Sequence, residues 1–204
     1  TKPPLITSGN RISTGIEDLN DLVAGGFERG SFNLLEVGKE AGLYYLWILR
    51  PFVASLVQHK IPVMILPCEG EPTEEIRRWI APFVGEENFS TYVRIVEFRE
   101  VEKSEPYIIR ISGKNIDEDY QLVLNEARRL MGMTGSRQVA VIVGVDTLEY
   151  HYGVHDAHKM LVLTSVYSKT GNLLVMAVAK YGQELIKVLN HMATTHFKLE
   201  NIEG

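Results

Sequence analysis

The sequence lacks the features that mark secreted and membrane-spanning proteins. It has a single cysteine, Cys68, so it cannot form an internal disulfide framework, and this fits a reducing compartment. No apolar run is long enough to cross a bilayer, and the N-terminus shows no signal-peptide pattern. We therefore expect a protein of the cytoplasm with no membrane association.

An excess of positive charge is also absent. The chain has 21 Lys and Arg against 26 Asp and Glu, a formal net charge of −5. Sequence-independent affinity for a phosphate backbone needs clustered basic side chains. The visible basic residues fall on expected amphipathic helices or their edges, where solvation is the default: Arg77, Arg78, Arg128, Arg129 and Arg137. Nucleic-acid binding is possible but is not supported by charge.

What the chain does contain is a regular alternation of strand-like and helix-like segments. Its 204 residues, 45% of them hydrophobic, suit one domain with a substantial core. Residues 1–10 are polar and hold Pro3–Pro4, so we expect an arm there and a single domain over 11–204. Strands are predicted at 31–35, 62–67, 92–98, 107–112, 139–145, 172–179 and 194–200, and helices at 43–58, 73–79, 117–131, 150–169 and 184–192. This alternation predicts an α/β fold, and Thr73 is expected to cap the 73–79 helix.

The segment Leu34–Leu46, LLEVGKEAGLYYL, has the layout of a phosphate-binding loop. A strand turns through glycines into a helix, an arrangement that aims backbone N–H groups at an anion. The working pattern G-x-x-x-x-G-K-[ST] adds a lysine for the phosphates and a hydroxyl for Mg²⁺. With Gly42 as its second glycine, these positions hold Leu43 and Tyr44, and the first glycine is Val37. The loop therefore lacks the groups that hold a triphosphate.

The helix after this loop has two unusual features. Pro51 lies in its interior, where proline removes a hydrogen bond, so we expect a kink or a break. Large aromatic rings crowd its start. We expect Trp47 to pack in the core, whereas Tyr44 either packs or occupies the space that a nucleotide needs.

The stretch before the loop is more distinctive. Residues 12–31 read ISTGIEDLNDLVAGGFERGS, with Ile16, Leu19, Leu22 and Val23 at helical spacing and Thr14 placed to form a capping box with Glu17. This segment resembles the one that precedes the phosphate loop in KaiC and RecA-like ATPases, especially archaeal KaiC-like proteins. The resemblance implies a RecA-like three-layer core, in which helices flank a twisted, mostly parallel sheet.

The resemblance also implies roles for individual residues. Glu69, at the end of the 62–67 strand, matches the base that activates water, although a solvated carboxylate is an equal alternative. Asp146, in VDTLE, matches the acid that contacts Mg²⁺. The degenerate phosphate loop would be formed by Gly38, Lys39, Gly42 and Tyr44. Because this loop has no lysine at the required position, Glu69 and Asp146 are vestigial candidates.

Two other chemistries carry less weight. Cys68 beside Glu69 is expected to be an inert packing residue, because burial and a neighbouring carboxylate disfavour a thiolate. A metal site could draw its ligands from a histidine-rich segment and nearby acids, namely His151, His155, His158, Asp156 and Asp146. No HExxH motif is present, so the simpler interpretation is the start of a solvated helix.

Three functions follow, in descending order. The first is a KaiC/RecA-like pseudo-ATPase that does not hydrolyse ATP and acts as a structural or regulatory subunit, associating with itself or with an active RecA/KaiC-like paralogue. It needs no cofactor. The second is an ATP-binding protein or slow ATPase that uses Mg²⁺ and Lys39. The third is a DNA-binding protein like the recombinase paralogues.

Overall fold

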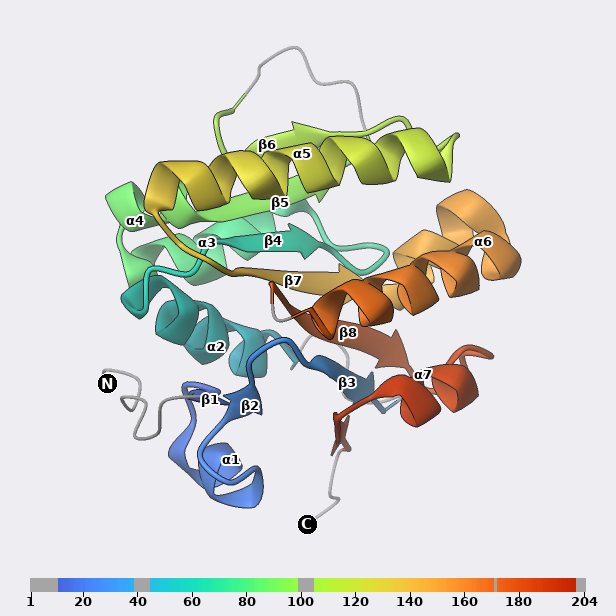
Figure 1. The fold of residues 1–204 in the computed structure, drawn as a ribbon, viewed down its shortest axis with the longest axis horizontal. Helices are drawn as coiled ribbons and strands as arrows, with labels where there is room; N and C mark the ends of the chain where they lie inside the picture. The colour runs from blue at the N-terminus through green and yellow to red at the C-terminus, as the bar shows by residue number, and fades with distance from the viewer. Residues whose placement is uncertain (1–10, 39–44, 99–104, 171, 201–204) are drawn as a thin grey trace.

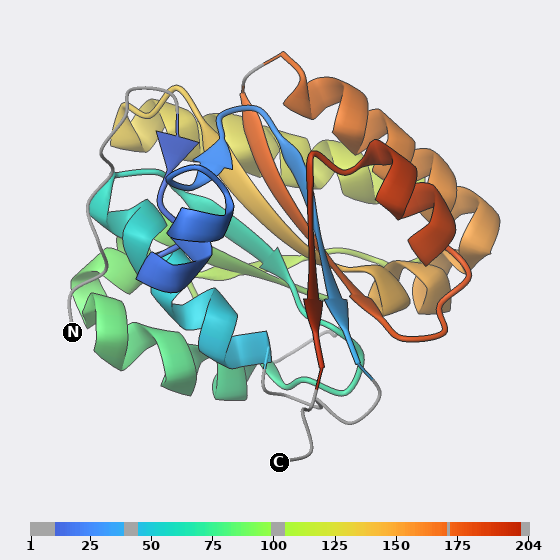
Figure 2. The same cartoon turned by 90° about the horizontal axis from the view of Figure 1, so that it is seen from below.

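A twisted sheet of seven parallel strands runs through the centre of the described residues (Figures 1 and 2). The structure is a computed structural model, and it describes residues 11–38, 45–98, 105–170 and 172–200. The strand order is β6-β5-β4-β7-β8-β3-β9, and every pairing is parallel. The strands are β3 (Phe32–Val37), β4 (Val63–Leu66), β5 (Val93–Glu97), β6 (Ile108–Arg110), β7 (Val139–Gly144), β8 (Leu173–Lys180) and β9 (Thr195–Leu199).

Helices cover both faces of this sheet (Figure 1). One face packs against α2 (Leu46–Gln58), α3 (Thr73–Val84) and α4 (Glu86–Tyr92) through one apolar cluster. The other face packs against α5 (Ile116–Thr134), α6 (Val145–Ser168) and α7 (Ile186–Met192) through a second cluster. The central strands are buried on both sides, which explains their continuous apolar sequences. The predicted α/β architecture, a parallel sheet flanked by helices, is confirmed.

A small N-terminal unit lies against α2. It consists of β1 (Arg11–Ile12) paired antiparallel with β2 (Phe27–Glu28), and of α1 (Glu17–Leu22) between them. Its contacts with α2 include a hydrogen bond from Ser55 Oγ to the Ser13 carbonyl at 2.9 Å. Gly15 also has φ +80° and lies so close to α2 that a Cβ would be 2.1 Å from the Pro51 oxygen. Only glycine fits there, so α1 is held directly beside α2.

Both predicted helix caps are wrong. Ile16, not Thr14, precedes α1, because the Thr14 hydroxyl donates to Asn20 Oδ1 at 2.8 Å. Pro72, not Thr73, precedes α3, because the Thr73 hydroxyl donates to Glu97. In each case the hydroxyl group that was expected to cap the helix is hydrogen-bonded to another side chain instead.

Helix α2 also differs from expectation. It runs without interruption from Leu46 to Gln58, so Pro51 does not break it. Trp47 is 54% exposed, and the prediction that it packs in the core is wrong. The neighbouring Tyr45 is buried instead. The ring of Trp47 lies on the outer surface of α2, edge-on to Trp79 of α3 with 5.2 Å between ring centroids.

Helix α6 starts earlier than predicted. It begins at Val145, directly after β7, and Gly153, with φ 81° and ψ 162°, divides it into two parts. The first part carries the end of β7 straight into the candidate site. Among the described residues, no helix combines the length and apolar character needed to cross a membrane.

Candidate functional site

The candidate site lies at the carboxyl edge of the sheet, where the ends of β4, β7 and β8 meet. Ligands of open parallel sheets bind at this edge. Close packing brings the strand ends together, because a Cβ on Gly144 would lie 2.7 Å from the backbone of Cys68. This contact brings the residues that follow β4 next to those that follow β7.

Asp146 is the centre of this site. Its Oδ2 lies 3.0 Å from Lys180 Nζ and accepts the Glu69 backbone N–H at 3.2 Å. Its Oδ1 accepts the Thr147 N–H at 2.9 Å. The side chain of Asp146 is 17% exposed. Both carboxylate oxygens therefore have donors from the chain itself.

Lys180 was missed in the sequence, although it ends the apolar run of β8. It is placed beside Val37 of β3, the strand that leads into the phosphate-loop segment. Burial lowers the pKa of Lys180, but the hydrogen bond and charge of Asp146 outweigh burial and raise it. Its ammonium also lies 3.5 Å from the Glu69 carbonyl oxygen. Lys180 is therefore a cation held between the ends of β4 and β7.

Glu69 lies next to Asp146 through its backbone, but its side chain points elsewhere. Glu69 Oε1 is 3.7 Å from His151 Nε2. The His151 ring stacks on Phe98, with 3.7 Å between centroids and 12° between planes. His151 is thus part of this site. Among the described residues, no group of three His, Cys, Asp or Glu side chains is arranged to hold a metal ion, so the hypothetical histidine site does not form.

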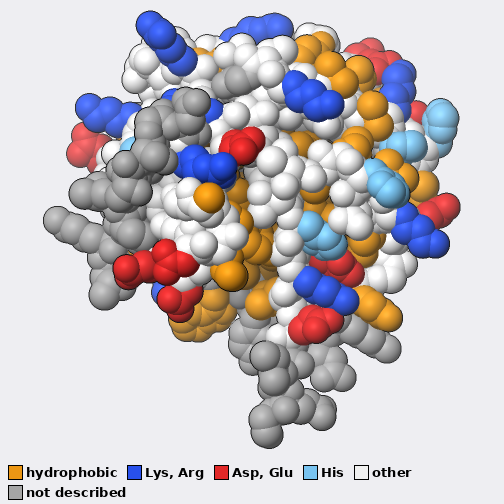
Figure 3. Space-filling model, turned by 60° about the horizontal axis from the view of Figure 1, so that its bottom comes forward, with side chains coloured by type: hydrophobic (Ala, Val, Ile, Leu, Met, Phe, Trp, Pro, Cys, Tyr) orange, Lys and Arg blue, Asp and Glu red, His pale blue; other side chains and the backbone are white. Residues whose placement is uncertain are grey.

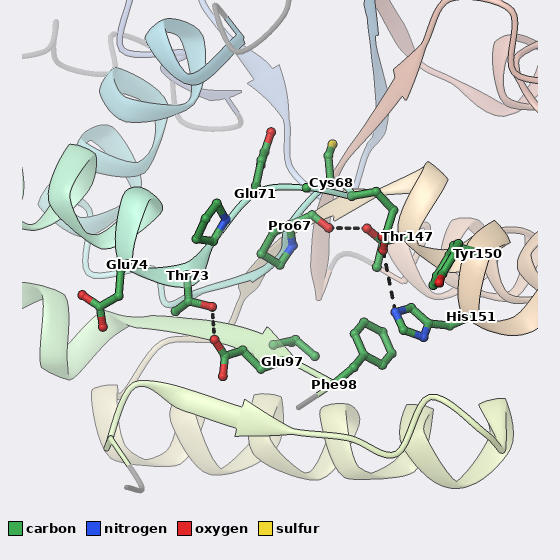
Figure 4. Close-up of a pocket in the computed structure, with 14 residues that line it drawn as sticks. Pro67, Cys68, Glu71, Thr73, Glu74, Glu97, Phe98, Thr147, Tyr150 and His151 are labelled. Atoms are coloured by element: carbon green, nitrogen blue, oxygen red, sulfur yellow. Dashed lines mark hydrogen bonds and ion pairs between the residues drawn. The ribbon is translucent and has the colours of Figure 1, made fainter. Parts of the chain in front are cut away.

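Glu71 adds a second acid near Lys180. Burial raises the pKa of Glu71 to about 7, although the charge of Lys180 opposes this shift. Its Oε1 is buried and has no hydrogen-bond partner among the described residues. Figure 4 shows its side chain pointing away from Glu97 and Phe98. At neutral pH this carboxyl group is therefore partly protonated.

A cavity of about 630 Å³ opens beside these groups, beneath the ends of β4 and β5 (Figure 4). Thr147 Oγ1 donates to the Pro67 carbonyl at 2.6 Å and closes one side of it. The lining contains four glutamates and an aromatic wall, and in the described part of the chain it includes neither Lys nor Arg: Glu69, Glu71, Glu74, Glu97, Phe98 and His151 lie along it. This acidic lining disfavours an anionic ligand.

The remaining predicted residues are placed as follows. Cys68 is buried, and burial together with Asp146 raises its thiol pKa, which agrees with an inert packing role. The Gly38 N–H donates to the Leu199 carbonyl at 2.7 Å and so pairs with the edge strand β9. Lys39, Gly42, Leu43 and Tyr44 lie outside the described residues, and their predicted part in a phosphate loop stays a prediction.

The order and connections of the strands, with Asp146 two residues after β7, match a fold of the KaiC-like RecA type. Among solved structures, the chain is similar to a KaiC-like protein from the hyperthermophilic archaeon Pyrococcus horikoshii OT3. The TM-score is 0.64 at 16% sequence identity, and the match covers 96% of this chain and 85% of that one. At this identity the likeness concerns the fold alone. No family model and no curated protein matches the sequence.

Proposed function

We propose that this chain is a KaiC/RecA-like protein that does not hydrolyse ATP and serves as a structural or regulatory subunit in the cytoplasm. The fold supports the family, and the residues at the carboxyl edge support the loss of chemistry. The observation that carries the proposal is the ion pair between Asp146 and Lys180, at 3.0 Å.

This ion pair bears on magnesium binding. In P-loop ATPases the acid after the corresponding strand faces the shell of Mg²⁺, which neutralises the phosphates. Here the same carboxylate already has an ammonium and two backbone N–H groups as partners. A metal would have to displace Lys180 and leave that cation without its anion. The described residues therefore do not fit a magnesium-bound nucleotide in the usual way.

The charges around this ion pair also argue against ATP hydrolysis. Glu71 and Asp146 both act on the Lys180 ammonium, so among these described groups the charge is negative unless Glu71 is protonated. The sequence places Leu43 and Tyr44 where a phosphate-binding lysine and a hydroxyl belong. Losing the groups that stabilise a transferring phosphoryl group costs several powers of ten in rate.

Titration calorimetry with ATP and Mg²⁺ tests the proposal. We expect no binding at about 1 mM nucleotide and no phosphate release above a buffer blank, since the site lacks its main phosphate ligands. The variant Lys180→Met, which frees Asp146, is expected to remain inactive, and Lys187→Met on the exposed surface of α7 is the matched control. Micromolar binding with turnover by the unmodified protein would overturn the proposal.

A second candidate is an ATP-binding protein or slow ATPase, and the position of Lys180 favours it. Its side chain is 42% exposed and lies between the end of β3 and the end of β7. It is thus placed to contact a phosphate in a way that Leu43 cannot, alone or with Lys39. ATP binding that disappears in Lys180→Met or Lys39→Ala would establish this candidate, and the residue responsible would be identified by which variant loses it.

DNA binding is the third candidate. On the face drawn in Figure 3, the Lys and Arg side chains of the described residues are scattered among acidic ones instead of forming one stripe. Without such a stripe, counterion release gives little affinity. Titration of labelled single-stranded DNA at 50 mM salt tests this candidate, and a salt-dependent shift would support it.

A further inference from the structure

The outer surface of α2 and α3 carries an unusual cluster, which we name the aromatic patch: Trp47, Arg50, Trp79 and Phe83. The Arg50 guanidinium lies between the three rings, 5.4 Å from Trp47, 5.1 Å from Trp79 and 4.9 Å from Phe83. Trp47 and Phe83 are exposed. Trp, Arg and large apolar residues of this kind dominate the binding energy of protein interfaces.

Arg50 is the one member of this patch that needs a partner. Its Nε is buried without a hydrogen-bond acceptor, and among the described residues no carboxylate pairs with it. Two arginines on α3 do have carboxylate partners: Arg77 pairs with Glu86 at 2.8 Å, although its Nε is likewise buried without an acceptor, and Arg78 pairs with Glu75 at 3.6 Å. A guanidinium held by rings on its faces still has N–H donors at its edge. The patch therefore fits a partner that brings an apolar side chain and a carboxylate.

Helix α1 has these two groups. Its exposed carboxylates, Glu17, Asp18 and Asp21, make no hydrogen bond or ion pair within the described part of the chain. Leu22 ends the helix and is 76% exposed. Helix α1 thus offers acidic and apolar groups without partners, and the aromatic patch offers their complement.

The two surfaces lie on the same side of the molecule. Figures 1 and 2 both show α2 between α1 and α3, on one face of the sheet. The contacts of Gly15 with Pro51 and of Ser55 with Ser13 fix α1 beside α2. When a second copy is related to the first by a 180° rotation, α1 of each copy can meet the aromatic patch of the other. The same contact then forms twice. This is the geometry of an isologous two-fold interface.

We propose that two copies of this chain pair face to face, with α1 of each copy on the aromatic patch of the other. Charge complementarity selects a second copy as the partner, because the acidic and cationic halves belong to the same surface. The pair is closed, because each copy uses both of its complementary surfaces. The pairing names a second copy of the chain as the partner in the structural role proposed above. Only the biological purpose of the dimer, and not its formation, rests on that proposed function.

Sedimentation equilibrium from about 1 to 100 µM, without nucleotide, tests the pairing. The unmodified protein is expected to be a dimer at the upper concentrations. Arg50→Glu and Asp21→Arg, measured separately, each place like charges opposite one another at both contacts and should raise the dimer dissociation constant at least tenfold. Arg128→Glu, the same charge change on the exposed surface of α5, is the control and should not alter it.

Mixing the two variants gives the decisive result. In an equimolar mixture of Arg50→Glu and Asp21→Arg, one contact keeps the native pair of an aspartate and an arginine, and the other has the same two charges exchanged. A heterodimer should therefore form although each variant pairs poorly with itself. The double variant should recover its own dimer. A monomer at all concentrations, a dimer that is insensitive to both changes, or absence of rescue in the mixture would overturn the pairing. ATP turnover by a dimer would instead refute only the proposed function.

Discussion

Two cations of this molecule are in opposite situations. Lys180 lies at the carboxyl edge of the sheet with its ammonium 3.0 Å from a carboxylate of its own chain. Arg50 lies on the outer face of α2, stacked between three rings, and no carboxylate among the described residues pairs with it. The charge of Lys180 is therefore paired within the chain, whereas the charge of Arg50 has no carboxylate partner among the described residues.

The difference supports the pairing proposed above. A charge satisfied within the chain gains little from a ligand, because the ligand must first break the existing pair. A charge that is already partly desolvated but lacks a counterion gains from any partner that supplies one. The site expected from the resemblance is therefore the less available of the two, and the surface that the sequence did not indicate is the more available.

The largest expected effect is on the attachment of α1 to α2. Gly15→Ala places a Cβ 2.1 Å from the Pro51 oxygen at φ +80°, so we expect a loss of about 3 kcal/mol of stability or a displaced α1. Urea denaturation followed by circular dichroism measures this loss. Gly25→Ala is the control, since it shares the positive φ but has no atom within 4 Å, and it should cost about 1 kcal/mol. Equal losses in both variants would show that the contact with Pro51 does not matter.

The next largest effect concerns the ion pair between Lys180 and Asp146. Lys180→Met removes the cation from Asp146, and we expect a loss of about 1–2 kcal/mol, reduced from the value for a fully buried pair because Lys180 is partly exposed. Chemical denaturation at pH 7 measures it. Lys187→Met should change stability by less than about 0.5 kcal/mol, because a surface substitution without a partner rarely does more. A neutral Lys180→Met would show that the pair contributes nothing to stability.

The pH dependence of the same edge follows from Glu71. Burial raises its pKa to about 7 from an unfolded value near 4.5, so the folded state binds more protons between these values. Stability from this group is therefore full below about pH 4.5 and decreases as pH rises to about 7. Glu71→Gln should be more stable than the unmodified protein at pH 8, by about 1–2 kcal/mol after allowance for partial exposure, and equal to it near pH 4.5. Thermal melts at both pH values measure the difference, and a constant gap would contradict it.

The smallest effect is expected at Arg50, the cation without a carboxylate partner among the described residues. Arg50→Met keeps an apolar stem against the rings and removes a charge that has no counterion, so the monomer should lose no more than about 1 kcal/mol. Denaturation at sub-micromolar concentration measures the monomer alone. A loss larger than that of Lys180→Met would reverse the comparison between the two cations.

The sequence predicted the fold well because strands buried on both sides appear as continuous apolar runs. The runs at 62–67, 139–145 and 172–179 became β4, β7 and β8 with ends shifted by at most one residue. Exposure was harder to predict. Trp47 was expected in the core but lies on the surface, and Leu22 is also exposed although it shares helical spacing with Ile16 and Leu19. Spacing shows which residues share a side of a helix, and it does not show whether anything covers that side.

The site was predictable only in part. Asp146 and Glu69 follow strands, and parallel strands bring their carboxyl ends to one edge, so their proximity follows from the sequence pattern. The partner of Asp146 did not follow, because Lys180 belongs to a strand whose neighbours are set by the order of the whole sheet. His151 was noticed for the wrong reason, as a metal ligand, whereas it stacks on Phe98 and faces Glu69.

The order of the strands has a consequence for biosynthesis. Asn33 of β3 donates to the Val175 carbonyl of β8 at 3.1 Å, across 142 residues of chain, and β3 has β8 and β9 as its only neighbours in the described sheet. A ribosome must therefore release most of the polypeptide before this early strand finds either side of its ladder. Such distant pairing slows folding and leaves a nascent hydrophobic segment exposed to chaperones during synthesis.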